Sequence, residues 1–405
     1  MNRTVRRLCS LLLPCLALLT ALAPPARAAE ERKPNTLTPR EVTDGWVLLY
    51  DGATSFGWSP RGDAQWQSLD GTLSPVAGTG KGVLATNPEF ADYHLRLDFW
   101  LDEKANSGVF QRCAPSGEVS GTNAYEVNLF DAHAKWPTGS INEIAKAKTT
   151  VKTVGRWNTL EVEAVGKRFR VKVNGKSTVD ALDPKFARGA LALQYNGVGV
   201  VKFRNIRLLP LSTRPIFNGK DLTGWKVLPG HASVYTVTPE GWMNVKNGNG
   251  EIQSEEQFGD FVFQLQVISN GEHLNSGVFV RSTPGEFWNG YEAQIRNQWE
   301  GEDRKKPVDF GTGGLYFYQP TRNVVSSDHE WFTYTILAAG RHFTTWVNGY
   351  MTADWTDPRP ANAAARQGFQ GKPGVIGLQG HDPTTNLSFR DLKVAPLPAP
   401  REPVQ

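Results

Sequence analysis

The chain has 405 residues and three cysteines, and its 44 lysines and arginines exceed its 40 aspartates and glutamates by four. Residues 1–28, which we expect to be removed, hold four of these arginines and no acid, so the remaining chain carries no net charge (40 against 40) and we expect no nucleic-acid partner. Only Cys113 follows residue 28, which excludes an intrachain disulfide and a cysteine-rich metal site in the mature chain.

The N-terminus has the pattern of a secretory signal peptide. Arginines between Arg3 and Arg7 precede an apolar run from Leu8 to Ala23, and Ala26-Arg27-Ala28 is a small-x-small cleavage site. Pro14 interrupts the run, which is shorter than a comfortable membrane span of ~20 residues, and no later segment is long and apolar enough. We therefore expect an exported protein, periplasmic or extracellular, with no transmembrane segment.

The rest of the chain is a tandem repeat. Residues 29–43 are expected to be a flexible lead-in, and two domains follow over residues 44–210 and 213–396, with a proline-rich tail over 397–405. The clearest pair of matching segments is Asn106–Arg112 and Asn275–Arg281, which are identical at six of seven positions.

Other motifs repeat in the same order. Each copy has an Asx-Gly turn before a tryptophan, a Tyr-Glu strand, a Val-Asn-Gly hairpin, a Leu-Gln strand and a closing Phe-Arg strand. Short alternating runs separated by turn residues recur throughout, and no long stretch has a helical period. The pattern predicts two antiparallel sheets packed face to face in each copy.

This series of motifs resembles the 3-keto-disaccharide hydrolase domain family, formerly a domain of unknown function, over nearly all of both halves. The resemblance implies an all-β fold of two tandem concanavalin A-like jelly-roll β-sandwiches. It also implies action on glycosides oxidised at the sugar 3-position. Together with the signal peptide, this predicts an exported enzyme that cleaves 3-keto-glycosides by base-initiated elimination or by hydrolysis.

The strand after the repeated Asn-Ser-Gly segment is the predicted site. Glu126 and Asn128 lie two apart and share a face, and Asp131 joins them only if a bulge shifts the register. The second copy has Glu292 and Gln294 there and no second carboxylate on this strand. Conventional retaining glycosidases use two carboxyls ~5–5.5 Å apart, which the second copy cannot supply from this strand.

A 3-keto sugar needs only one base, because the ketone acidifies the proton on carbon 2 and the glycosidic oxygen on carbon 1 can then leave by elimination. We assign the base to Glu292 or Glu126, enolate stabilisation to Arg281 or Arg112, and protonation of the leaving oxygen to His381 or His133. Structural alternatives stay open: each Glu could pair with the Arg across neighbouring strands, and the histidines could lie in surface loops.

Further residues are expected to hold the sugar, either as polar partners or as aromatic rings that stack on it. These substrate-binding candidates are Asn275, Gln294, Tyr291, Trp288, Trp299, Asn106, Asn128, Asp131 and His133. A divalent metal stays open, because Asp131 with His133, or His381 with Asp382, places a carboxylate near an imidazole.

We favour the second copy as the active one, since it keeps Gly290-Tyr291-Glu292 and His381. The alternative function is a non-catalytic, lectin-like carbohydrate-binding protein.

Overall fold

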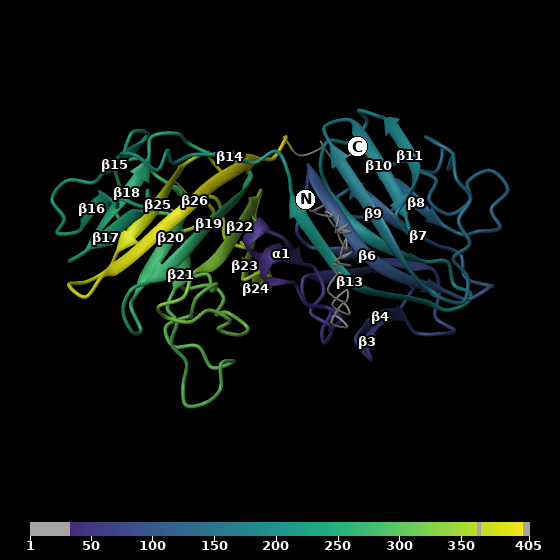
Figure 1. The fold of residues 1–405 in the computed structure, drawn as a ribbon, viewed down its shortest axis with the longest axis horizontal. Coiled ribbons are helices and arrows are strands. Elements are labelled where there is room, and N and C mark those ends of the chain that lie inside the picture. Colours follow the sequence, from purple (N-terminus) through teal and green to yellow (C-terminus); the bar gives the residue numbers. More distant parts are fainter. Residues whose placement is uncertain (1–32, 363–365, 400–405) are drawn as a thin grey trace, which may run out of the picture. The chain divides into compact units, whose positions relative to one another are not determined.

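The computed structural model describes residues 33–362 and 366–399, and the predicted signal peptide lies outside them. Nearly all regular structure in the described residues is β, in four antiparallel sheets that form two sandwiches (Figure 1). The predicted fold class, two tandem concanavalin A-like β-sandwiches, is therefore confirmed.

The first sandwich pairs a large sheet with a five-stranded sheet. The large sheet runs in the order β11 (Lys176–Leu182), β10 (Arg168–Val173), β9 (Trp157–Val165), β6 (Tyr93–Leu101), β13 (Val201–Pro210), β4 (Thr72–Pro75) and β3 (Trp66–Leu69), with β1 (Val47–Leu48) on β13. The smaller sheet runs β2 (Trp58–Gly62), β5 (Gly82–Thr86), β12 (Ala190–Tyr195), β7 (Ser107–Cys113) and β8 (Tyr125–Leu129).

The second sandwich repeats this topology. Its large sheet runs β16 (Val234–Val237), β17 (Met243–Lys246), β26 (Asn386–Pro396), β19 (Phe261–Ser269), β22 (Phe332–Ala339), β23 (His342–Val347) and β24 (Tyr350–Thr356), with β14 (Arg214–Pro215) on β26. Its five-stranded sheet runs β15 (Trp225–Val227), β18 (Gly250–Ser254), β25 (Val375–Gly380), β20 (Ser276–Ser282) and β21 (Tyr291–Ile295).

The alternation of each strand fixes which side chains form the core. Along β21, Tyr291, Ala293 and Ile295 lie in the core of the second sandwich, as do Ile252 of β18 and Leu378 of β25. Because successive side chains of a strand point to opposite faces, the residues between them lie on the outer face of the five-stranded sheet. This face carries the candidate site.

The lead-in is more ordered than predicted. Helix α1 (Pro39–Asp44) begins with a capping box in which Thr38 and Glu41 bond reciprocally, and it ends at Gly45 in the left-handed conformation with φ 93°. Before it, Asn35 is buried against Asn205. A flexible lead-in over 29–43 is therefore wrong from Asn35 onward, and the Thr-x-x-Glu signal for the helix was present in the sequence.

The start of the predicted tail is also bonded to the body of the protein. Leu397 donates its backbone N–H to Asp260, and the carbonyl of Pro398 accepts from Arg188.

Candidate active site

The outer face of the second five-stranded sheet gathers polar side chains from three strands, with one phenylalanine from a fourth. We call this the acidic face; its residues are Glu251 and Gln253 on β18, Gln379 on β25, Phe279 on β20, and Glu292 and Gln294 on β21. All six are buried under the loops that cover the sheet. Burying polar side chains, two of which are carboxyl groups, lowers the stability of the fold. Such a face therefore indicates a candidate functional site.

Glu292 is the predicted base, and the part of the chain that the structure describes holds its carboxylate through one oxygen, Oε2. Its Oε2 accepts hydrogen bonds from Trp288 Nε1 at 3.2 Å and from Arg366 Nη2 at 2.8 Å. Burial raises the pKa of Glu292, and the Arg366 cation beside it acts in the opposite direction. A buried carboxylate with a raised pKa is a stronger base than one in water.

The glycine of the repeated Asn-Ser-Gly motif makes room for this carboxylate. A Cβ on Gly277 would lie 2.6 Å from Glu292 Oε1, closer than any real contact. Gly108 has the same relation to Glu126 in the first copy, also at 2.6 Å. The motif that we read as a turn therefore determines the position of the glutamate on the next strand.

The second acid of the face is Glu251, which the sequence analysis did not identify. It is fully buried, and its carboxylate accepts hydrogen bonds from Gln253 Nε2 at 2.9 Å and from the backbone N–H of Trp288 at 3.0 Å. A side chain on Gly377 would occupy its place. Burial, with a smaller repulsion from Glu292, raises the pKa of Glu251 to about 7.

Trp288 connects the two acids, since its backbone N–H binds Glu251 and its indole N–H binds Glu292. Its ring also lies under the guanidinium of Arg366, 4.2 Å from the ring centroid. The two acids lie on different strands, β18 and β21, and are 41 residues apart in sequence (292 minus 251). The strand of Glu292 therefore does not reveal its partner acid. The available signal was a lone Glu within the strand pattern Gly250–Ser254.

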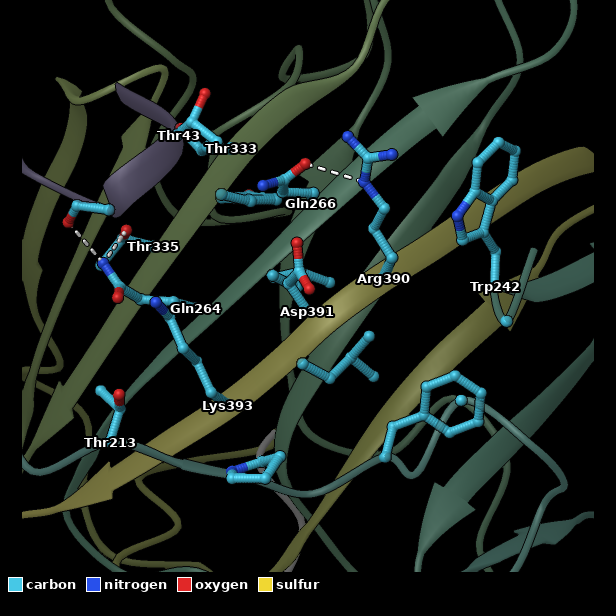
Figure 2. A pocket seen from close by; sticks show the side chains of 18 of the residues that line it. Thr43, Thr213, Trp242, Gln264, Gln266, Thr333, Thr335, Arg390, Asp391 and Lys393 are labelled. Carbon is cyan, nitrogen blue, oxygen red and sulfur yellow. Dashed lines mark hydrogen bonds between the residues drawn. The ribbon is translucent and has the colours of Figure 1, made fainter. Parts of the chain in front are cut away.

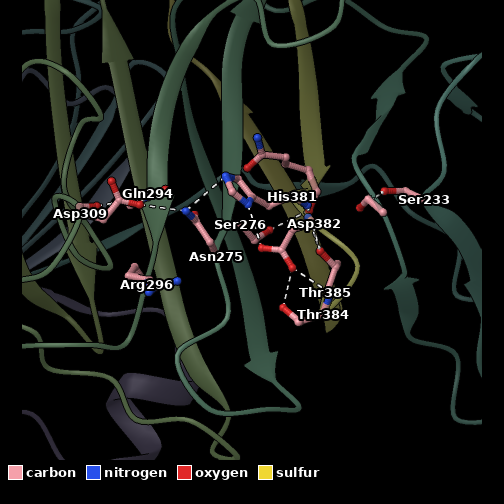
Figure 3. A network of polar contacts seen from close by, with 12 residues as sticks. Ser233, Asn275, Ser276, Gln294, Arg296, Asp309, His381, Asp382, Thr384 and Thr385 are labelled. Carbon is pink, nitrogen blue, oxygen red and sulfur yellow. Dashed lines mark hydrogen bonds and ion pairs between the residues drawn. The ribbon is translucent and has the colours of Figure 1, made fainter.

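A polar network extends the acidic face at one edge (Figure 3). Asn275 Nδ2 donates to Asp309 Oδ2 at 2.8 Å and lies 3.3 Å from His381 Nε2, and Asp309 also accepts from Gln294. His381 Nδ1 lies 2.9 Å from Asp382 Oδ2. Because Asn275 Nδ2 can only donate, we assign the proton of neutral His381 to Nδ1, directed at Asp382. The structure thus brings the predicted Asn275, Gln294 and His381 into one network.

Several buried polar atoms of this region have no partner among residues 33–362 and 366–399. They are the side-chain oxygens of Asn275, Gln294 and Gln379, and Nε and Nη1 of Arg366. Buried polar groups are normally hydrogen-bonded, and unpaired ones indicate a place where a ligand or water binds. Acceptors beside a cation suit the hydroxyl and carbonyl groups of an oxidised sugar.

The predicted enolate stabilisers lie elsewhere. A bulge in the β20–β25 pairing between Phe279 and Ser282, with φ 54° at Arg281, turns the Arg281 side chain away from the acidic face. Arg281 donates instead to the carbonyls of Gly259 and Gly340 and pairs with Asp260 at 2.5 Å. It is a buried structural residue, and the cross-strand pair of Glu292 with Arg281 that we also considered is replaced by the pair with Arg366.

Arg112 occupies the matching position in the first copy. Its backbone also has a positive φ of 52°, and it donates to the carbonyls of Ala91, Gly166 and Phe186. The predicted role of Arg112 beside Glu126 is corrected for the same reason.

Tyr291 is corrected as a substrate-binding residue, because it points into the core. Its hydroxyl donates to Asp357 at 2.7 Å and its ring lies 4.1 Å from that of Phe343. Trp299 is half-buried, with the guanidinium of Arg304 4.0 Å from its ring centroid. Of the two tryptophans, Trp288 is the one that hydrogen-bonds residues of the acidic face.

The first copy presents a different outer face. Val83, Ala85, Phe110 and Ala192 form an apolar cluster there, and Val83 and Ala85 hold the places of Glu251 and Gln253 in the β-ladder. Glu126 is half-buried, accepts from Asn142 at 2.8 Å, and burial raises its pKa.

The other candidates of the first copy stabilise loops. Asp131 accepts from Thr138 and Thr153, and His133 Nδ1 accepts from the backbone of Lys135 and Trp136. Asn128 donates to the Trp136 carbonyl, and Asn106 is half-buried. The structure therefore does not assemble the series Glu126, Asn128 and Asp131 into a pair of facing carboxylates.

The described residues hold no group of three His, Cys, Asp or Glu side chains placed to bind a metal ion. Within the same residues, no helix is long and apolar enough to cross a membrane.

Comparison with known proteins agrees with the repeat. The family model described as 3-keto-alpha-glucoside-1,2-lyase-like domain matches twice, at residues 45–209 and 212–395. A search of curated proteins found no match.

Similar solved structures each cover one part of the chain. A protein from Parabacteroides distasonis, provisionally titled a glycosyl hydrolase, is 19% identical over 44% of this chain and 100% of its own, with a TM-score of 0.40. The carbohydrate-binding module CBM66 from Bacillus subtilis is 20% identical over 37% of this chain and 94% of its own, with a TM-score of 0.31.

Proposed function

Because the chain belongs to the 3-keto-alpha-glucoside-1,2-lyase-like domain family, we propose that it cleaves glycosides oxidised at carbon 3 of the sugar, on the acidic face of the second sandwich. The observation that carries the proposal is the pair of buried acids, Glu251 and Glu292, held by one residue, Trp288. The first copy has Val83 in place of Glu251 and an apolar face around it.

The proposed reaction is an elimination. Glu292 takes the proton from carbon 2, and the electron pair of that bond passes to the ketone oxygen on carbon 3 as an enolate. When the enolate collapses, a double bond forms between carbons 1 and 2 and the bond from carbon 1 to the glycosidic oxygen breaks. The leaving oxygen takes a proton, so the step consumes no water; addition of water to the double bond afterwards would give the products of hydrolysis.

Three side chains divide the work. Glu292 is the base, and its Oε1 accepts no hydrogen bond from the described residues. Arg366, with unpaired buried nitrogens beside Glu292 in the described structure, stabilises the enolate oxygen. Glu251, whose pKa is raised to about 7, is protonated in part of the molecules at neutral pH and donates the proton to the leaving oxygen, the role that the sequence analysis gave to His381 or His133.

The test is turnover of a 3-keto-disaccharide by purified protein, with and without an added divalent cation, followed as release of the free sugar. Loss of a catalytic base typically costs ~10²–10⁴ in rate, so Glu292→Gln is expected to lose nearly all turnover. Glu126→Gln is the matched control, since it is the same change on the equivalent strand of the first copy. Both variants are first shown to be folded by circular dichroism.

Two outcomes would change the assignment. A dead Glu126→Gln beside an active Glu292→Gln would move the site to the first sandwich. Binding of the 3-keto-disaccharide without any release of product by the parent protein would exclude the enzyme and leave the lectin-like function.

We also propose that the protein is exported and that residues 1–28 are its signal peptide. N-terminal sequencing of the protein recovered outside the cytoplasm is expected to begin at Ala29; an N-terminus at Met1 would contradict export by this route.

A further inference from the structure

A hollow of about 590 Å³ lies over the large sheet of the second sandwich, apart from the residues of the acidic face. Its floor is formed by β19, β22 and β26, and its rim by the turn at Trp242 and the segments around Thr43 and Thr213 (Figure 2). The volume falls in the range of ~300–1,000 Å³ typical of small-molecule sites. The predicted reaction does not use these residues.

The floor is polar and its side chains are held in place. Arg390 Nε donates to Gln266 Oε1 at 2.9 Å, and the Arg390 guanidinium stacks 3.9 Å from the ring centroid of Trp331. Gln264 Nε2 donates to the Gly45 carbonyl and to Thr335, which fixes its amide plane. The planar amides of Gln264 and Gln266 and the guanidinium of Arg390 are thus held in fixed orientations in the floor of the hollow.

Groups able to bind a ligand remain in this floor. The buried Oε1 of Gln264, which is 3% exposed, has no partner among the described residues. In the same residues the Asp391 carboxylate and the Lys393 ammonium have no hydrogen bond or ion pair. Trp242 lies at the right-hand end of the view in Figure 2, half-buried and in edge-to-face contact with Trp331.

In the first sandwich, a side chain of the protein itself covers the position that corresponds to this hollow. Its bulge residue Asn205, with φ 54°, matches Asp391 with φ 55°. Asn35 exchanges hydrogen bonds with Asn205, from Asn35 N at 2.6 Å and from Asn205 N at 2.7 Å, and also binds the Gly71 carbonyl. In the first copy a planar polar group from the lead-in therefore occupies the place over the bulge, whereas residues 33–362 and 366–399 place no such group over Asp391.

We propose that this hollow is a second, non-catalytic carbohydrate site that binds a neutral oligosaccharide. A sugar ring presents an apolar face that stacks on an aromatic ring, which Trp242 offers, and a rim of hydroxyls that act as donors and acceptors at once. Asp391 and Gln264 supply acceptors, and Lys393 and the terminal nitrogens of Arg390 supply donors. The proposal does not depend on the elimination chemistry, because these residues lie on the other sheet.

The experiment is titration calorimetry of the full protein with maltotetraose, laminaritetraose and cellotetraose. At least one is expected to bind, and Trp242→Ala is expected to weaken that binding at least tenfold, roughly the loss on truncating a central aromatic contact. Lys393→Ala, a change at a half-exposed residue without a partner in the described structure, is expected to weaken it several-fold. Trp100→Ala, a half-buried tryptophan on the large sheet of the first sandwich, is the matched control and is expected to bind as the parent does.

Turnover of the 3-keto-disaccharide separates this site from the acidic face. Trp242→Ala is expected to keep the parent rate, and Glu292→Gln to keep oligosaccharide binding. If none of the three oligosaccharides binds the parent, or if Trp242→Ala and Lys393→Ala both bind like the parent, the proposal is overturned. Binding that is lost in Glu292→Gln and kept in Trp242→Ala would place the sugar on the acidic face and also overturn it.

Discussion

Glu251 gives a prediction that depends on the structure alone and needs no substrate. Replacing it with Gln keeps the size of the side chain and one oxygen acceptor for Gln253 or Trp288, but it removes the acid. A protonated Glu251 likewise has one acceptor oxygen free of the proton. We therefore expect Glu251→Gln and the parent to have similar free energies of unfolding at low pH, within about 1 kcal/mol, the net value of one hydrogen bond.

The two proteins should diverge as the pH rises. The pKa of Glu251 is raised in the folded state from 4.5 to about 7, so the folded protein binds this proton more tightly than the unfolded chain does. The parent therefore loses stability as pH rises from 4.5 to about 7 and loses no more above it, whereas the variant has no such loss. A pKa difference of one unit corresponds to about 1.4 kcal/mol. The free energy of unfolding of the variant should therefore exceed that of the parent by roughly 3 kcal/mol at pH 8, within a factor of two.

The assay is urea unfolding of both proteins at several values between pH 4.5 and 8.5, with the difference between them plotted against pH. Glu256→Gln, which removes a carboxylate that is 53% exposed and lies outside the site, controls for the change in net charge. A difference between Glu251→Gln and the parent that stays constant over the range would refute the reasoning, because it would mean that Glu251 is ionised alike in both states.

The remaining predictions concern turnover. Gly277→Ala is expected to lose most activity, since the new methyl group would displace the Glu292 carboxylate, and Gly108→Ala to lose little; equal rates for the two variants would contradict the second copy as the active one. Arg366→Gln is expected to move the acid limb of the pH–rate profile to higher pH, because Arg366 lowers the pKa of Glu292. An acid limb at the same pH in the variant would argue against their contact. The parent rate is expected to fall as pH rises through about 7, where Glu251 loses its proton, and a plateau from pH 6 to 9 would exclude it as the acid.

The position of Glu292 shows how far local sequence reasoning carries. Alternation along Tyr291–Ile295 places Glu292 and Gln294 on one face, and the structure agrees. The same rule failed at Arg281, because it assumes a regular strand and a bulge between Phe279 and Ser282 breaks the register. Nothing in the seven residues of the motif announces the bulge.

Arg366 and Glu251 illustrate the other limit. Arg366 comes from a loop 74 residues after Glu292 in the chain, and Glu251 comes from β18, which β25 and β20 separate from β21 in the sheet. Neither stands in a local pattern with Glu292, so their contact with the same residue, Trp288, depended on the order of the strands.

The sequence by itself determined the repeat, the all-β class and the strand that carries the candidate base, because these follow from local periodicity and from comparing the chain with itself. Only the tertiary structure decided the partners of that base and the difference between the two faces. Antiparallel sheets place side by side strands that are far apart in the chain, and burial by the covering loops then sets the charge and pKa of what they bring together.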